Sequence, residues 1–167
     1  MDNLAFDFFV NTESKTITVK RTFQASLENV WQAWTTAEIL DKWWAPDPYR
    51  AETKHLDFRN GGYWLYAMVS PEDKKHWSKT VFGEIETLKS YTAQDIFCDE
   101  YGNPITGMPQ SFWKIAFIPE RENVLVDISI TFETLEALEQ TMLMGFREGF
   151  ASGLNNLEKL LSASKMI

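Results

Sequence analysis

Cysteine is almost absent from this sequence, and positive charge is scarce. The chain of 167 residues contains one cysteine, Cys98, so no disulfide can form within it and a metal site built from several cysteines is excluded. Lys and Arg number 16 against 24 Asp and Glu, which gives a formal net charge of -8 at pH 7. Such a charge repels phosphate backbones and anionic membrane surfaces. We therefore expect a cytoplasmic protein with no nucleic-acid partner and no membrane partner.

Long apolar runs and catalytic motifs are also missing. No stretch approaches the ~20 apolar residues of a membrane span, and the first residues lack the basic and apolar regions of a secretion signal. The GxSxG, GxxxxGK[ST] and GxGxxG motifs do not occur, and the spacing of His55 and His76 does not suit zinc. We expect no cofactor, no metal and no catalytic residue. Acid-base chemistry by Glu84, Glu86, Asp95 or His55 would require the fold to bring one of them into a cavity.

Aromatic residues, in contrast, are abundant. They make up 14% of the chain, with 12 Phe, 7 Trp and 5 Tyr, and four of the tryptophans fall within residues 30–46. Helical spacing at Trp31 and Trp34 favours burial of these rings in a core or at one end of it, and a ligand wall is the alternative. Trp44, beside Pro46, is the residue of this group that we expect nearest the rim of a cavity.

Hydrophobic periodicity predicts an α+β fold. Apolar residues alternate over 15–23, recur at helical spacing over two short segments within 26–45, and return to alternation from 49 to 132. Residues 134–162 then carry one broad apolar stripe, which predicts a single helix of ~28 residues. We expect a curved antiparallel sheet of about seven strands wrapped around this helix, with two short helices after the first strand.

Three glycines punctuate the predicted long helix. Gly145, Gly149 and Gly153 recur every four residues, and each costs about 1 kcal/mol relative to alanine in a helix interior. Close packing of the helix against bulky sheet residues would offset this cost, and space for a ligand is the alternative. We expect close packing.

Four segments in order resemble one known family. They are "VKRTFQASLENVWQAWTTAEILDKWWAP", "LDFRNGGYW", "VFGEIETL" and "MGFREGFASGLNNLEKLL". Together they are similar to the START-like superfamily (SRPBCC), in the branch of the activator of heat-shock protein 90 ATPase. The resemblance implies a helix-grip fold over a single domain, 1–167 with a core of about 15–162, and an apolar cavity as in many members. Lipid carriers, hormone receptors, polyketide cyclases and co-chaperone domains share this fold, so the fold alone does not select a function.

The sequence favours a binding protein over an enzyme. We expect a non-catalytic START-like protein, monomeric or homodimeric, that binds a small hydrophobic or amphipathic ligand between the C-terminal helix and the sheet. A chaperone-partner or stress-response module and a polyketide-cyclase-like enzyme are the alternatives. Asp57 and Arg59 are expected to pair in a hairpin, with anchoring of a ligand's polar end as the alternative role. The candidate ligand-binding residues are Trp44, His55, Asp57, Arg59, Trp64, Tyr66, Trp113, Phe117, Met142 and Phe146.

Overall fold

The computed structural model describes residues 6–163, in which eight strands and four helices form. The strands are β1 (Phe6–Asn11), β2 (Thr16–Phe23), β3 (Arg50–Leu56), β4 (Tyr63–Val69), β5 (Lys75–Glu86), β6 (Ser90–Cys98), β7 (Ser111–Glu120) and β8 (Asn123–Phe132). The helices are α1 (Leu27–Thr35), α2 (Ala37–Trp43), α3 (Leu135–Leu143) and α4 (Phe146–Ser162).

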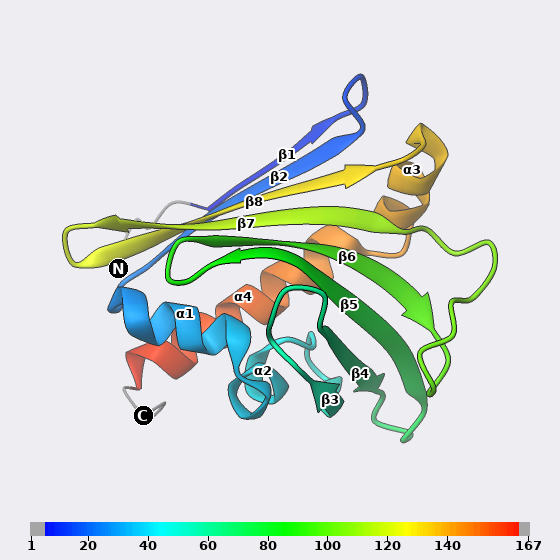
Figure 1. Ribbon diagram of the computed structural model, residues 1–167, viewed down its shortest axis with the longest axis horizontal. Helices are drawn as coiled ribbons and strands as arrows, with labels where there is room; N and C mark the ends of the chain where they lie inside the picture. Colours follow the sequence, from blue (N-terminus) through cyan, green and yellow to red (C-terminus); the bar gives the residue numbers. More distant parts are fainter. Residues whose placement is uncertain (1–5, 164–167) are drawn as a thin grey trace.

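All eight strands belong to one antiparallel sheet, in the order β1-β2-β8-β7-β6-β5-β4-β3. Figure 1 shows the sheet curving over α4, with α1 and α2 on the same side as α4 and α3 beyond the start of α4. The predicted α+β class and helix-grip arrangement are therefore confirmed. The inner face of the sheet and the helices beneath it enclose the core.

A β-bulge contributes to the curvature of the sheet. The pairing of β5 with β6 shifts register between Phe82 and Ile85, and Gly83 lies inside this shift. A Cβ atom on Gly83 would lie 2.4 Å from Oγ1 of Thr92, so glycine is required for the close approach of the two strands. The same Oγ1 accepts a hydrogen bond of 3.0 Å from the backbone N–H of Glu84. Bulges of this kind bend a strand and increase its twist.

The tryptophans of α1 and α2 lie in the core at one end of the sheet. Trp31, Trp34 and Trp43 expose 8%, 2% and 1% of their surface. Trp31 packs edge-on against Phe117 with ring centroids 5.0 Å apart, and the indole N–H of Trp43 donates a 2.9 Å hydrogen bond to the carbonyl of Ala33. These three rings close the core, as their helical spacing indicates.

The strand count differs from the expected seven because β1 precedes the first predicted strand. This strand starts at Phe6, before the predicted core boundary at residue 15, and the two short helices consequently follow β2. It is an edge strand that pairs only with β2. Phe9 and Val10 are 60% and 40% exposed, so burial does not impose a regular alternation that the sequence could reveal.

The predicted helix over 134–162 is wrong as a single element. It is interrupted between Leu143 and Phe146, where Gly145 has a φ angle of +86°. This left-handed conformation favours glycine and cannot continue a right-handed helix. Both flanking helices turn apolar side chains toward the sheet, so the apolar stripe continues across the break and conceals it.

Gly153 and Gly149 differ in what surrounds them. A Cβ atom on Gly153 would lie 3.0 Å from the carbonyl oxygen of Trp44 and 3.2 Å from that of Trp43. Close packing thus explains why a glycine is needed at position 153. The helix packs there against the backbone at the end of α2, and not against a side chain of the sheet. A Cβ atom on Gly149 would make only an ordinary contact of 3.6 Å with the ring of Pro46.

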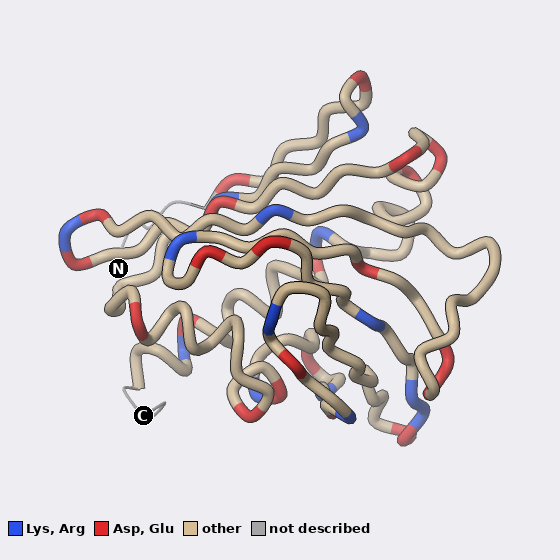
Figure 2. Tube along the Cα trace, viewed as in Figure 1, with Lys and Arg blue, Asp and Glu red and all other residues tan. Residues whose placement is uncertain are grey.

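No helix within residues 6–163 is long and apolar enough to cross a membrane. Figure 2 shows the Lys and Arg positions interspersed with Asp and Glu along the described chain. The acidic excess is therefore spread over many loops and strands.

Alanine substitutions should separate the roles of the two glycines. Gly149→Ala should raise the free energy of unfolding by up to about 1 kcal/mol, because alanine favours the helix and fits beside Pro46. Gly153→Ala should be less stable than Gly149→Ala by about 1–3 kcal/mol, because its methyl group presses on two backbone carbonyls. Urea denaturation of both variants measures the difference. Equal stabilities would contradict the close contact at Gly153.

Candidate ligand cavity

A cavity of about 290 Å³ lies between the inner face of the sheet and the first turns of α4. Pro46, Gly145 and Gly149 border it from the helical side. Because two of these three residues have no side chain, the helix leaves space where it faces the sheet. The aromatic rings around the cavity are those of Trp44, Tyr66, Phe97, Trp113, Phe132, Phe146 and Phe150.

Strand alternation brings the sheet residues of the cavity together. Tyr66 pairs with Ser78, and Ser78 with Phe97, across β4, β5 and β6. Asp95 pairs with Ser111 across β6 and β7. Residues directly opposite in an antiparallel sheet point to the same face, so these five side chains converge on the inner side.

Two hydrogen bonds orient aromatic rings in the cavity wall. The indole N–H of Trp44 donates to the hydroxyl of Tyr66 at 2.9 Å, and the indole N–H of Trp113 donates to the hydroxyl of Ser111 at 2.9 Å. Trp64 stacks on Tyr66 with ring centroids 4.0 Å apart. Burial raises the pKa of Tyr66, so its hydroxyl stays protonated at neutral pH. These contacts therefore fix the orientation of the rings, and much of the polarity of the wall is used within the protein.

Asp95 is the acidic residue of the cavity. Its Oδ1 atom accepts a 2.9 Å hydrogen bond from the hydroxyl of Thr80. Burial raises the pKa of Asp95 to about 6, an effect that the bond from Thr80 partly opposes. Asp95 takes part in none of the ion pairs found among residues 6–163. Its carboxylate is therefore held in an apolar wall without a protein cation.

A second, much smaller cavity lies behind the first. Its volume is about 20 Å³, enough for about one water molecule, and Trp44, Asp95 and Trp113 border both spaces. Trp34 also borders it, and the indole nitrogen of Trp34 is the one buried side-chain nitrogen or oxygen without a hydrogen bond in the described residues. The partition between the two cavities thus consists of two indoles and one carboxylate.

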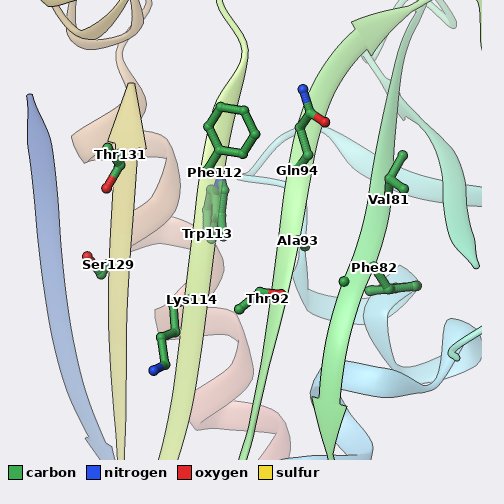
Figure 3. Close-up of a pocket in the computed structure, with 11 residues that line it drawn as sticks. Val81, Phe82, Thr92, Ala93, Gln94, Phe112, Trp113, Lys114, Ser129 and Thr131 are labelled. Carbon is green, nitrogen blue, oxygen red and sulfur yellow. The ribbon is translucent and has the colours of Figure 1, made fainter. Parts of the chain in front are cut away.

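The opposite face of the sheet carries a broader groove. Figure 3 shows it over β5, β6, β7 and β8, with α4 behind the sheet. The groove measures about 440 Å³ and is lined by Gln94, Lys114 and the half-exposed ring of Phe112, among others. It is open to solvent and does not enclose a ligand. The inner cavity is the better candidate for binding a small molecule.

Four of the ten predicted ligand-binding residues border the larger cavity, namely Trp44, Tyr66, Trp113 and Phe146. Trp64 borders only the smaller cavity. Phe117 packs instead in the aromatic core next to Trp31, and Met142 is half-buried against that core. These two apolar positions pack in or against the core, and neither borders the larger cavity.

The three predicted polar contacts lie outside the cavity. The ring of His55 lies beside that of Tyr63, with centroids 4.5 Å apart and planes tilted by 35°, and both residues are exposed. Asp57 and Arg59 form an ion pair of 2.5 Å at the turn between β3 and β4, which agrees with the favoured hairpin role. A register shift within β3 pairs His55 with Leu65, and none of the three predicted polar contacts lines the cavity. The cavity therefore does not include this group.

Asp95 borders the cavity but is not among the ten predicted ligand-binding residues. Of the four candidates for acid-base chemistry, Asp95 alone borders the cavity, whereas Glu84, Glu86 and His55 are exposed. The alternation of Ala93, Asp95 and Phe97 on β6 is the signal that places this carboxylate inward.

An antiparallel sheet curved around a C-terminal helix, with an apolar space between them, defines a START-like protein of helix-grip architecture. The model of the family "Activator of Hsp90 ATPase homolog 1-like protein" matches residues 24–162, and the chain belongs to this family. A comparison with curated proteins found no match.

Solved structures from several bacteria share this fold. Protein Ms6760 from Mycobacterium smegmatis is 28% identical, with a TM-score of 0.87 over 95% of this chain and 96% of that one. A protein from Arthrobacter aurescens is 25% identical, with a TM-score of 0.89 over 94% of this chain and 91% of that one. A protein from Staphylococcus epidermidis is also 25% identical, with a TM-score of 0.81 over 95% and 96% of the two chains.

Replacement of Asp95 by asparagine should stabilise the protein near pH 7. The rise of the pKa from 3.8 to about 6 corresponds to at most ~3 kcal/mol, because the folded protein holds the proton more tightly than the unfolded chain. The penalty on the wild type therefore grows as the pH rises from about 4 to about 6 and is absent below that window. Asp95→Asn should be more stable by up to this amount near pH 7, and the difference should vanish near pH 4.

Urea denaturation of both proteins across this pH range is the measurement. Glu86→Gln, an exposed position at the end of β5, is the matched control. A stability difference that stays constant from pH 4 to pH 7 would show that the charge of Asp95 is not buried.

Proposed function

We propose that this protein binds a small hydrophobic or amphipathic molecule in the inner cavity and does not transform it. The observation that carries this proposal is the space of about 290 Å³ with aromatic walls, between the helix and the sheet. Small-molecule pockets usually measure about 300–1,000 Å³, so this cavity suits a compact ligand of one or two rings better than a long acyl chain.

The composition of the cavity supports binding without catalysis. Catalysis requires a nucleophile, base or electrophile that converge on one point. Among the described residues that line the cavity, Asp95 is the one acid, and the raised pKa of Tyr66 keeps that hydroxyl protonated. The cyclase alternative would need a second acid or base that ionises near neutral pH beside Asp95, and the lining supplies none in the described part of the chain, because burial raises the pKa of Tyr66.

A thermal-shift screen tests the proposal. The panel contains fatty acids, sterols, flavonoids and small aromatic compounds, and differential scanning calorimetry gives the unfolding midpoint Tm. A ligand present at about 100 times its Kd adds about 2.7 kcal/mol to the stability, which raises Tm by roughly 5–10 °C at this chain length. Gly149→Leu should abolish the shift, because its side chain enters the cavity beside Pro46.

Glu148→Leu is the matched control for this experiment. It adds the same side chain at the neighbouring exposed position and should keep the ligand-induced shift. A panel without any shift in the wild type, or an equal shift in Gly149→Leu, would contradict binding in this cavity.

A chaperone-related role is the second candidate, and the family description favours it. That role would use the outer surface, so it should not depend on the cavity. If it holds, the protein should raise the ATP turnover of an Hsp90-type chaperone several-fold, and Gly149→Leu should do so equally well. A steady-state ATPase assay measures this, and unchanged turnover would exclude ATPase activation.

A further inference from the structure

The carboxylate of Asp95 is only partly satisfied by the protein. Oδ1 accepts the bond from Thr80, and no hydrogen bond to Oδ2 occurs among the described residues. The side chain borders both cavities, so its accessible surface faces these spaces. Asp95 is partly buried, and a carboxylate that is withdrawn from bulk water without a cation or a full set of donors is costly. A ligand that enters the cavity and donates a hydrogen bond or supplies a positive charge to this carboxylate therefore gains binding free energy.

The hydroxyl of Tyr66, on the same wall, has other partners. It accepts the indole N–H of Trp44 and is hydrogen-bonded to Ser78. The hydroxyl of Ser111, opposite Asp95 on β7, accepts the indole N–H of Trp113. These bonds orient the wall and leave the negative charge of Asp95 without a counter-charge. A ligand can supply that charge.

The two indoles beside Asp95 suit a positively charged group. Trp44 and Trp113 border both cavities together with the carboxylate, and their ring centroids are 6.2 Å apart. An ammonium group within about 6 Å of an indole face is attracted by the ring, and the attraction strengthens when water is excluded. The carboxylate and both rings thus favour the same kind of head group.

We propose that the cavity selects amphipathic amines, with the protonated amine paired to Asp95 and the apolar part held between α4 and the sheet. This inference rests on the proposed function, because it requires that the cavity bind a small molecule. A ligand carboxylate would be repelled by Asp95, and a neutral hydroxyl could donate one hydrogen bond but would leave the charge uncompensated. The net charge of -8 also favours the approach of a cation.

Four compounds with one skeleton separate these head groups. They are propylbenzene, 3-phenylpropan-1-ol, 3-phenylpropylamine and 3-phenylpropanoate, and isothermal titration calorimetry on the full chain near pH 7 gives each Kd. The amine should bind at least about 10-fold more tightly than the alcohol, and the carboxylate should bind most weakly. One ion pair of modest strength gives a ratio of this size.

Asp95→Asn should weaken binding of the amine at least about 10-fold, because the amide keeps the shape of the side chain and loses its charge. Binding of propylbenzene should be unchanged, which also verifies that the variant is folded and its cavity intact. Glu86→Gln removes one negative charge at an exposed position and should bind the amine as the wild type does.

The outcomes separate this inference from the proposed function. The selection of amines is overturned, and binding in the cavity remains, if propylbenzene binds but the amine has the same Kd as the alcohol. The same conclusion follows if Asp95→Asn binds the amine as tightly as the wild type does. If none of the four compounds binds to the wild type, both are overturned.

Discussion

The close contact between α4 and the end of α2 determines much of the site. Gly153 lets the helix approach the carbonyls of Trp43 and Trp44, and two hydrogen bonds flank this contact. Asn156 donates to the carbonyl of Ala45 at 3.2 Å, and the backbone N–H of Asp47 donates to the hydroxyl of Ser152 at 3.2 Å. The segment after α2 is therefore anchored to α4, and the indole of Trp44 is held against the sheet as an end wall of the cavity.

The cavity exists because close packing stops one turn earlier in α4. Gly149 has the same lack of a side chain as Gly153, yet it faces open space and the ring of Pro46 in place of a backbone. At Gly145 the left-handed backbone ends the preceding helix and lets α4 begin in a new direction. Glycine thus has three different roles here: Gly145 separates the two helices, Gly149 leaves space for the cavity, and Gly153 allows the close contact with α2.

Much of the fold follows from periodicity, and the details that define the site follow from tertiary contacts. Alternation over 49–132 indicates the strands because one face of the sheet is buried. The edge strand β1 lacks such burial, and the break at Gly145 leaves the apolar stripe intact, so neither is visible in the pattern. Phe117 shows the limit for the site: periodicity places its ring inward, but only the surrounding rings decide whether an inward residue meets a ligand or the core.

In the proposed binding of an amine, the inner wall combines two features that have opposite effects on stability but act together on the ligand. Aromatic walls supply apolar contact that is tolerant of ligand shape, whereas Asp95 introduces a partly buried charge at a cost to folding. A hydrophobic side chain at that position would relieve the cost but would leave a cavity with little means to orient a ligand. Because START-like folds serve many functions, single polar positions on the inner face are where members with the same architecture can differ in ligand. We propose that in this chain Asp95 is such a position: it accepts a hydrogen bond from Thr80 and borders the smaller cavity together with two indoles.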